Sequence, residues 1–302
     1  MVKNLVLENI SVGFKLPQGV FYAVDDVSLN LPGGNFTAII GESGCGKSVL
    51  GQAILNILPS GVVKKGRVLY NGEQVKKILS AFGIIPQNPS ESLNPVRKIG
   101  KQMQDILAVH NIVDSSNSYK KQCLRLFGLQ EAERVLAAYP HELSGGMLQR
   151  VLCAMAVSSK PEWILADEPT KGLDEQVGAV VRKNLLTIKQ DLYLSMLIIT
   201  HDIALAQEVC DDVLVMYAGQ VLEHNADIWH KPLHPYTKGF LQALPKNGLQ
   251  VIPGKAPVPG ESFTGCKFAA RCPYCTTRCK EEKPAMQQVG NAEVRCFLYA
   301  EG

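Results

Sequence analysis

The most constraining feature of the sequence is a glycine-rich string at residues 41–48, Gly-Glu-Ser-Gly-Cys-Gly-Lys-Ser. It follows an apolar run at residues 36–40 and precedes a helical pattern at residues 49–58. Glycines at this spacing let backbone N–H groups curl around a phosphate, and the N-terminus of the next helix adds partial positive charge. Lys47 then reaches the β- and γ-phosphates, and the hydroxyl of Ser48 ligates magnesium. This string, the phosphate-binding loop, predicts a site for ATP and Mg²⁺.

Short apolar runs alternate with longer helical patterns along most of the chain. The runs at residues 36–40, 163–166 and 196–199 are continuously apolar, which is typical of strands covered on both faces. We therefore expect an α/β fold with flanking helices. Residues from about 96 to 158 break the alternation and predict a helical subdomain, and residues 213–223 predict a hairpin that closes the sheet.

Two carboxylates, Asp167 and Glu168, follow the apolar run at residues 163–166. In a chain without other signals such a pair is more often a helix cap or a solvated turn. In a protein with a phosphate-binding loop, the first carboxylate approaches magnesium and the second polarises the attacking water as a general base. The combination predicts nucleotide hydrolysis.

A third string, Leu-Ser-Gly-Gly-Met-Leu-Gln-Arg at residues 143–150, narrows the interpretation. By itself it predicts only a helix capped by Ser144, whose exposed backbone amides form an anion site. Lying between the phosphate-binding loop and the acidic pair in the sequence, it closely resembles the signature motif of ABC ATPases. The resemblance covers nearly the whole chain and implies the P-loop ABC ATPase fold, a mixed sheet with flanking helices and a helical subdomain.

The resemblance also assigns roles to residues that would be unremarkable alone. It implies that Phe14 stacks on adenine, that the Gln87 loop touches magnesium and the membrane subunit, and that the Asp174 loop crosses a dimer interface. It implies that His201 is the switch histidine that contacts the γ-phosphate. The residues 171–172, Lys-Gly, depart from the small residues that many members carry in that interface loop.

The resemblance thus implies catalytic roles for Glu168, His201 and Gln87 and magnesium ligation by Ser48, Gln87 and Asp167. The positions that it assigns to the nucleotide are Phe14, Gly41, Glu42, Ser43, Gly44, Cys45, Gly46, Lys47, Ser48, Val49, Ser144, Gly145, Gly146 and Asp174.

Three further stretches, at residues 87–95, 234–237 and 265–273, resemble the ATPases that power importers of di- and oligopeptides and of nickel or its chelates. The resemblance implies integral membrane permeases as partners, a second ATPase chain that is identical or paralogous, and an extracytoplasmic substrate-binding protein acting indirectly. Two alternatives stay open: a non-transport ABC ATPase of DNA repair or translation, and a metal or iron–sulfur sensing module. The cargo stays open as well.

The texture of the sequence changes after Pro245, where prolines and glycines cluster. We therefore expect a nucleotide-binding domain at residues 1–245, and a proline- and glycine-rich linker with a cysteine-rich regulatory tail at residues 246–302. Four tail cysteines have five, six and sixteen residues between them, a set that suits an iron–sulfur cluster, zinc or packed reduced thiols: Cys266, Cys272, Cys279 and Cys296. Related peptide-transporter ATPases carry a [4Fe–4S] cluster in this tail, and under that interpretation Cys275 is spare.

Charge and hydropathy exclude other classes of protein. The formal net charge of +3, without a long basic run, argues against a nucleic-acid partner. The sequence contains no apolar window long enough to span a bilayer and no export signal. We expect a peripheral protein on the cytoplasmic face of the cell membrane.

Overall fold

The computed structural model divides the chain into two compact units, which we describe separately. Unit 1 comprises residues 1–3, 32–36 and 77–209, and unit 2 comprises residues 4–31, 37–76 and 210–302. The structure describes residues 3–17, 19–74, 81–112, 116–244, 248, 250–258 and 261–300, without the side chains of residues 89 and 90. The domain boundary expected at residues 245–246 lies outside these described residues and stays a prediction.

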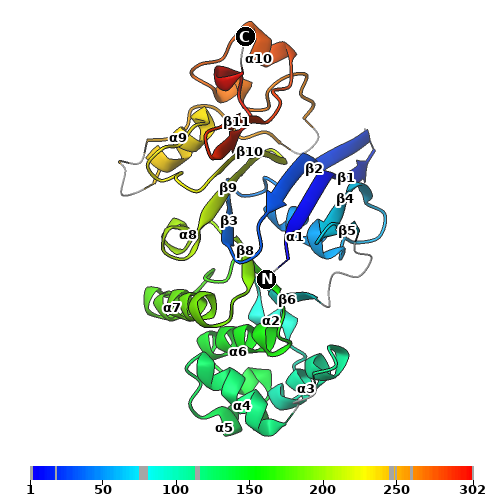
Figure 1. The fold of residues 1–302 in the computed structure, drawn as a ribbon, viewed down its shortest axis with the longest axis vertical. Coiled ribbons are helices and arrows are strands. Elements are labelled where there is room, and N and C mark those ends of the chain that lie inside the picture. Colours follow the sequence, from blue (N-terminus) through cyan, green and yellow to red (C-terminus); the bar gives the residue numbers. More distant parts are fainter. Residues whose placement is uncertain are drawn as a thin grey trace. The chain divides into compact units, whose positions relative to one another are not determined.

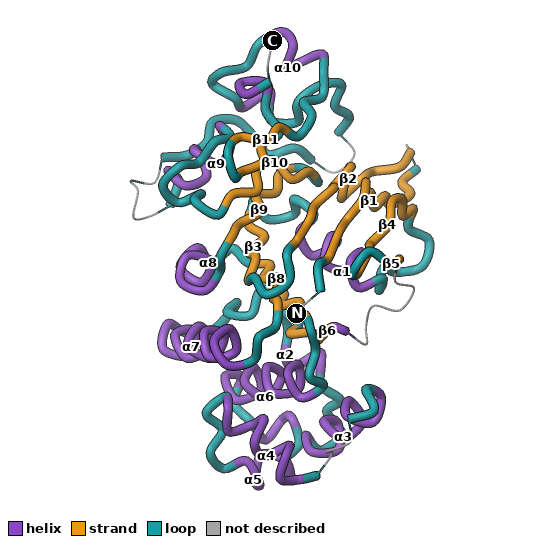
Figure 2. The backbone as a smooth tube through the Cα atoms, in the orientation of Figure 1, coloured by secondary structure: helices purple, strands orange, loops and turns teal. Residues whose placement is uncertain are grey.

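Unit 2 contains an antiparallel sheet in the order β2-β1-β4-β5 (Figure 2). Its strands are β1 (Leu5–Leu16), β2 (Gly19–Leu31), β4 (Val63–Tyr70) and β5 (Glu73–Gln74). Strand β1 lies between β2 and β4 and buries the side chains of Leu5, Leu7, Ile10 and Val12. The long β2 strand leads toward the phosphate-binding loop, which its backbone touches at Ala23.

A second group of strands in unit 2 has the order β11-β12-β10-β9-β3. Their bounds are β3 (Phe36–Ile40), β9 (Asp212–Tyr217), β10 (Gln220–Asn225), β11 (Gln287–Val289) and β12 (Ala292–Val294). The β9–β10 hairpin is confirmed, but the expectation that it closes the sheet is wrong. On its other side β10 pairs with β12, because the tail returns to cover that edge with Val294 opposite Glu223.

The helices of unit 2 are α1 (Lys47–Leu55), α9 (Pro235–Gln242) and α10 (Thr277–Glu281), with 3₁₀ turns η4 (Ala269–Arg271) and η5 (Phe297–Tyr299). Helix α1 follows β3 through the phosphate-binding loop, as the sequence predicts. The described residues from 250 to 258 form no helix or strand, in agreement with the clustered prolines and glycines.

Unit 1 contains a parallel group of strands, β6 (Phe82–Ile85), β7 (Trp163–Asp167) and β8 (Ser195–Ile199), with β7 in the middle. Strands β7 and β8 bury almost every side chain, so the continuous apolar runs are confirmed as strands. Helices α7 (Glu175–Asp191) and α8 (Ile203–Val209) follow β7 and β8 along the chain.

The helical segment expected between residues 96 and 158 is present in unit 1, apart from residues 113–115, which are not described. Helices α4 and α5 pack against each other and α6 packs on α3 and α4, as the green ribbons of Figure 1 show. The helices of this segment and the short one before it are α2 (Pro89–Ser92), α3 (Ile99–Val109), α4 (Asn117–Leu126), α5 (Ala132–Ala137), η2 (Pro140–Glu142) and α6 (Gly145–Ser158).

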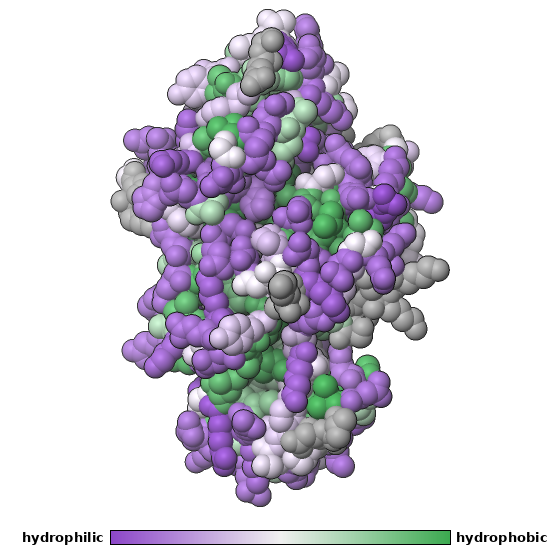
Figure 3. Space-filling view, in the orientation of Figure 1, coloured by the Kyte–Doolittle hydropathy of each residue, from purple (hydrophilic) through white to green (hydrophobic). Residues whose placement is uncertain are grey.

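The surface drawn in Figure 3 is largely hydrophilic, with hydrophobic residues gathered in small separate patches. Among the described residues, every helix falls short of the length and apolar character needed to cross a membrane.

Candidate functional site

The phosphate-binding loop of unit 2 is enclosed so tightly that two of its positions accept only glycine. Gly41 has φ 149° and Gly46 has φ 106°, both in the region that favours glycine. A Cβ atom on Gly41 would lie 2.2 Å from the carbonyl oxygen of Met216, and one on Gly46 would lie 2.1 Å from that of Ala23. The backbones of β9 and β2 therefore press on the loop from two sides and fix its path.

Lys47 is the first residue of α1, and its side chain turns back into the phosphate-binding loop. Its ammonium donates hydrogen bonds to the carbonyl oxygens of Gly41 at 2.9 Å and Glu42 at 3.0 Å, and the residue is 8% exposed. Ser48 and Val49 follow in the first turn of α1 and are half-buried. A buried cation, glycine backbone and a helix N-terminus are the donors that a triphosphate needs, so these residues fit ATP.

Contacts from distant segments hold the same loop in place. The backbone N–H of Glu42 donates to the hydroxyl of Tyr236 at 3.1 Å. The N–H of Gly219, in the β9–β10 turn, donates to the carbonyl of Cys45 at 2.9 Å. Burial raises the pKa of the Cys45 thiol, which therefore packs as a neutral side chain at physiological pH.

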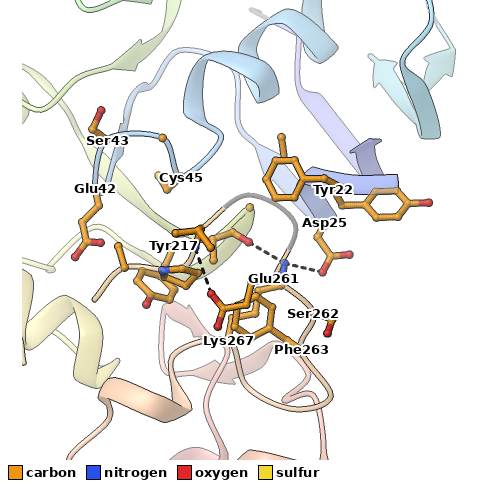
Figure 4. A pocket seen from close by; sticks show the side chains of 18 of the residues that line it. Tyr22, Asp25, Glu42, Ser43, Cys45, Tyr217, Glu261, Ser262, Phe263 and Lys267 are labelled. Carbon is orange, nitrogen blue, oxygen red and sulfur yellow. Dashed lines mark hydrogen bonds and ion pairs between the residues drawn. The ribbon is translucent and has the colours of Figure 1, made fainter. Parts of the chain in front are cut away.

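A cavity of about 450 Å³ opens beside the phosphate-binding loop (Figure 4). Its size lies in the range of small-molecule sites. The lining comes from the loop, from β2, from the β9–β10 turn and from the tail; it includes Phe21, Tyr22, Ala23, Glu42, Ser43, Gly44, Cys45, Gly219, Phe263 and Lys267.

Phe14, the aromatic residue expected to stack on adenine, is half-buried in β1 and does not line this cavity. It pairs across the strands with Phe21, which does line the cavity. Sequence reasoning missed Phe21 and Tyr22, which both line the cavity. Two adjacent aromatic residues in one strand were the signal that could have found them.

In unit 1 the structure brings Glu168 and His201 together. Nδ1 of His201 lies 2.7 Å from Oε2 of Glu168, and the backbone N–H of His201 donates to the same oxygen at 3.3 Å. An ionised carboxylate can only accept, so this contact assigns the proton to Nδ1. The register of β7 and β8 brings the two side chains together. Asp167 stands opposite Ile199, and Glu168 and His201 follow these two residues at the neighbouring strand ends.

The backbone of Glu168 is strained. Its φ is 50°, a left-handed conformation that a residue with a Cβ rarely adopts, while its N–H donates to the carbonyl of Ile199 at 2.7 Å. Such conformations persist only where neighbouring structure imposes them, and they concentrate at functional sites. The carboxylate is thus aimed by the end of β8 rather than left to solvent.

The signature string and the Asp174 loop also lie together in unit 1. Ser144 caps α6 by accepting from the N–H of Met147 at 3.4 Å, so the predicted capped helix is confirmed. Asp174 caps α7 by accepting from the N–H of Val177 at 2.9 Å. A Cβ on Gly146 would lie 2.9 Å from Cγ1 of Val177, so the helix start packs directly on α7. Gly145 faces open space, and Gln87 is exposed in a bend after β6.

The four tail cysteines face one cavity of about 180 Å³ in unit 2, and Cys275 does not line it. Burial is the main cause that raises the pKa of Cys266 to about 11 and raises the pKa values of Cys272 and Cys296. Within the described ranges, no three His, Cys, Asp or Glu side chains are placed to hold a single metal ion.

Two family models match the sequence: the ABC transporter model over residues 24–171, and the oligopeptide/dipeptide transporter C-terminal region over residues 222–279. The oligopeptide transport ATP-binding protein OppD of Haemophilus influenzae is 34% identical, over 98% of each chain. The dipeptide transport ATP-binding protein DppD of Escherichia coli is 36% identical, over 95% of this chain and 94% of the relative.

Among solved structures, a dimeric ATP-binding cassette in a post-hydrolysis state with ADP and Pi matches with a TM-score of 0.63 and 26% identity. The match covers 73% of this chain and 97% of the other. A second, from Clostridium perfringens, is part of an ABC transporter complex and matches with a TM-score of 0.61 and 27% identity, over 74% of this chain and 88% of the other. The P-loop ABC ATPase fold is thereby confirmed. The chain belongs to the ATP-binding subunits of ABC transporters, in their oligopeptide and dipeptide branch.

Proposed function

We propose that this chain hydrolyses ATP to drive the import of dipeptides or oligopeptides. The observation that carries the proposal is the phosphate-binding loop, with its buried Lys47, in a chain whose relatives across its whole length are peptide-transport ATP-binding proteins. The C-terminal family match adds support, because a general ABC ATPase model would cover only the first part of the chain. Neither DNA repair nor translation is named among these relatives.

We assign the chemical steps as follows. Lys47 and the loop amides bind the phosphates, and ligation of Mg²⁺ by Ser48, Asp167 and Gln87 would supply charge neutralisation on the β- and γ-phosphates. Glu168 accepts a proton from the attacking water, and His201 orients that carboxylate and contacts the γ-phosphate. The resemblance assigns adenine stacking to Phe14, whose cross-strand neighbour Phe21 is the aromatic residue that lines the cavity. These roles rest on the motifs and, for Glu168 and His201, on their 2.7 Å contact.

The proposed working unit is a pair of ATPase subunits, identical or paralogous. The exposed start of α6, at Ser144 and Gly145, would present its amides to the nucleotide held by the other subunit, and the Asp174 loop would lie at the same interface. Permeases would dock near the exposed Gln87 bend on the cytoplasmic face of the membrane. A substrate-binding protein would deliver the cargo to those permeases.

The cargo is tested in the reconstituted transporter. ATP hydrolysis is measured with the substrate-binding protein loaded either with a peptide or with a nickel chelate. We expect stimulation by the peptide-loaded protein and little response to the nickel-loaded one. Stimulation by nickel alone would overturn the peptide assignment while leaving the ATPase assignment intact.

We further propose that the tail, residues 246–302, holds a [4Fe–4S] cluster. Four thiolates on one cavity fit a cluster, in which they bind different irons and so stand farther apart than the ligands of a single ion. Cys266, Cys272, Cys279 and Cys296 would hold it, and its binding requires that metal ligation overcome the raised pKa values of Cys266, Cys272 and Cys296.

Anaerobically purified protein should contain about four irons with matching acid-labile sulfide and should absorb visible light. The Cys272→Ser variant should lose the iron, whereas the matched Cys275→Ser variant should keep it. Equal iron in both variants, or a colourless wild type containing zinc or no metal, would overturn the cluster.

A further inference from the structure

The segment between Cys266 and Cys272 has two chemically different faces. Its two cysteines line the tail cavity described above. Two cations between them, Lys267 and Arg271, instead contact the phosphate-binding loop and the β9–β10 turn that supports it. Both cationic side chains are almost completely buried, at 7% and 8% exposed. Burying a cation costs free energy unless the cation is paired. The partners of these two side chains therefore decide whether they stabilise the loop.

Arg271 reaches into the phosphate-binding loop itself. Its Nη1 donates to both carboxylate oxygens of Glu42, at 3.0 and 3.1 Å, and its Nε donates to the carbonyl of Pro253 at 3.0 Å. The guanidinium also lies over the rings of Tyr217 and Phe268, with 5.7 and 6.0 Å to their centroids. Several independent contacts therefore fix one position for its charge.

Lys267 supports the same loop from a second point, as Figure 4 shows. Its ammonium donates to the carbonyl of Ala218 at 2.7 Å and pairs with Asp25 at 2.9 Å. Ala218 precedes Gly219, whose N–H donates to the carbonyl of Cys45 in the loop. Burial would raise the pKa of Asp25, but the hydrogen bond and charge of Lys267 outweigh it and lower that pKa, so the pair is ionised.

The aromatic residue between the two cations joins these contacts into one packed layer. Phe268 is fully buried and lies 5.4 Å from both Tyr217 and Tyr236, centroid to centroid. Tyr236 accepts the hydrogen bond from the N–H of Glu42. Tyr236 therefore holds the backbone of Glu42, and Arg271 holds its carboxylate. Phe268 packs against both Tyr236 and Arg271.

The charge of Glu42 gives this arrangement a purpose. A carboxylate within a loop that binds a triphosphate repels the ligand when unpaired, because like charges at close range disfavour binding. We propose that Arg271 is a positioning residue for ATP: it neutralises Glu42 and holds the carboxylate away from the phosphates, so that the tail sets the affinity of the phosphate-binding loop. This inference rests on the proposed ATPase function and goes beyond it.

The test measures ATP affinity and turnover in the full transporter complex. Arg271→Ala should raise KM for ATP, and the Kd measured without hydrolysis, by about tenfold, with kcat changed less than about twofold. Arg271→Lys keeps the charge but loses the planar guanidinium. Its Kd for ATP should therefore lie between those of the wild type and Arg271→Ala. The control is Arg278→Ala, which removes an exposed Arg–Glu ion pair, with Glu282, elsewhere in the tail.

The decisive arm removes the carboxylate as well. Glu42→Gln combined with Arg271→Ala should bind ATP several-fold more tightly than Arg271→Ala alone, because no uncompensated charge is left. A merely structural role for Arg271 predicts no such recovery.

Arg271→Ala and Arg278→Ala with the same Kd for ATP, or no recovery in the double variant, would overturn the inference. If Arg271→Ala does not fold, Arg271→Lys decides in the same way: wild-type affinity for ATP overturns the inference, and a raised Kd supports it. Failure of the wild-type chain to bind ATP at all would instead contradict the proposed function, so the two failures are distinguishable.

Discussion

The phosphate-binding loop of unit 2 and the Glu168–His201 pair of unit 1 are held in opposite ways. The loop is fixed by residues from β2, β9, α9 and the tail, so segments more than 200 positions apart in the sequence enclose it. The Glu168–His201 pair rests on two neighbouring strand ends and a single side-chain contact, and the His201 side chain is 61% exposed. The loop is therefore enclosed by many segments, whereas few contacts hold the Glu168–His201 pair.

The strain in the two regions differs as well. In the loop, positive φ values fall on glycines, which adopt them at little cost. In the Glu168–His201 pair the positive φ falls on Glu168, a residue with a Cβ, at a cost of the order of 1–3 kcal/mol. Backbone strain of this kind is therefore absent from the loop proposed to bind phosphate and present at the carboxylate proposed to activate water.

The largest expected effect follows from breaking the enclosure of the loop. Gly46→Ala adds a Cβ that would lie 2.1 Å from the carbonyl of Ala23 at φ 106° and should lower the free energy of unfolding by about 3 kcal/mol. Gly44→Ala is the matched control, since its φ is 79° but nothing lies within 4 Å of its Cβ position. Denaturant unfolding of both variants measures the difference, and equal losses would mean that the enclosure is not tight.

A smaller effect follows from removing the buried cation. Lys47→Ala should weaken ATP binding between ten- and a hundredfold, roughly 1.5–3 kcal/mol, because a charge-assisted contact to phosphate is lost. The control is Lys64→Ala, whose ammonium also donates to backbone, at the carbonyl of Ala53 in α1. Nucleotide titration should leave Lys64→Ala near wild type; similar losses in both variants would point to general damage to α1.

The smallest effect concerns the scaffold behind the loop. Nδ1 of His234 accepts from the N–H of Tyr236, and burial, aided by Lys238, lowers the pKa of His234 to about 3. The unfolded chain protonates this histidine near its ordinary value of 6.5, so it binds more protons than the folded chain between those values. The contribution of His234 to the free energy of unfolding is therefore fully present above pH 6.5, and it is lost progressively as the pH falls from 6.5 toward 3.

Between pH 7 and pH 5.5 this histidine should cost about 1 kcal/mol of unfolding free energy. Urea unfolding at the two values measures it. His234→Asn should flatten the dependence, and His230→Gln, an exposed histidine in the same unit, should keep it. An unchanged slope in His234→Asn would show that another group titrates.

Local patterns predicted much of this molecule. The strand–loop–helix around residues 41–48, strands β7 and β8, and the capped start of α6 each carry their signal within a dozen residues. From the sequence, Glu168 and His201 could be assigned to one site only through the family resemblance, because each follows a predicted strand. Their 2.7 Å contact depends on the register of β7 and β8, which the sequence does not reveal.

Contacts between distant segments were not predictable. Arg271 and Glu42 are 229 positions apart, and neither residue carries a local sign of the other. The same holds for the pairing of β12 with β10, which overturned the expected sheet edge, and for the cover that Tyr236 gives to Glu42. Burial and charge neutralisation in the folded chain decide these contacts, and no periodicity in the sequence records them.

The most direct measurement of the central claim compares ATP binding with ATP hydrolysis in the Glu168→Gln variant. The substitution keeps size and removes the proton acceptor, so hydrolysis should fall by about 10²- to 10⁴-fold while the Kd for ATP stays near wild type. Glu175→Gln, an exposed carboxylate at the start of α7, is the control and should hydrolyse normally. Near-normal hydrolysis by Glu168→Gln would contradict the claim that Glu168 is the general base of an ABC ATPase.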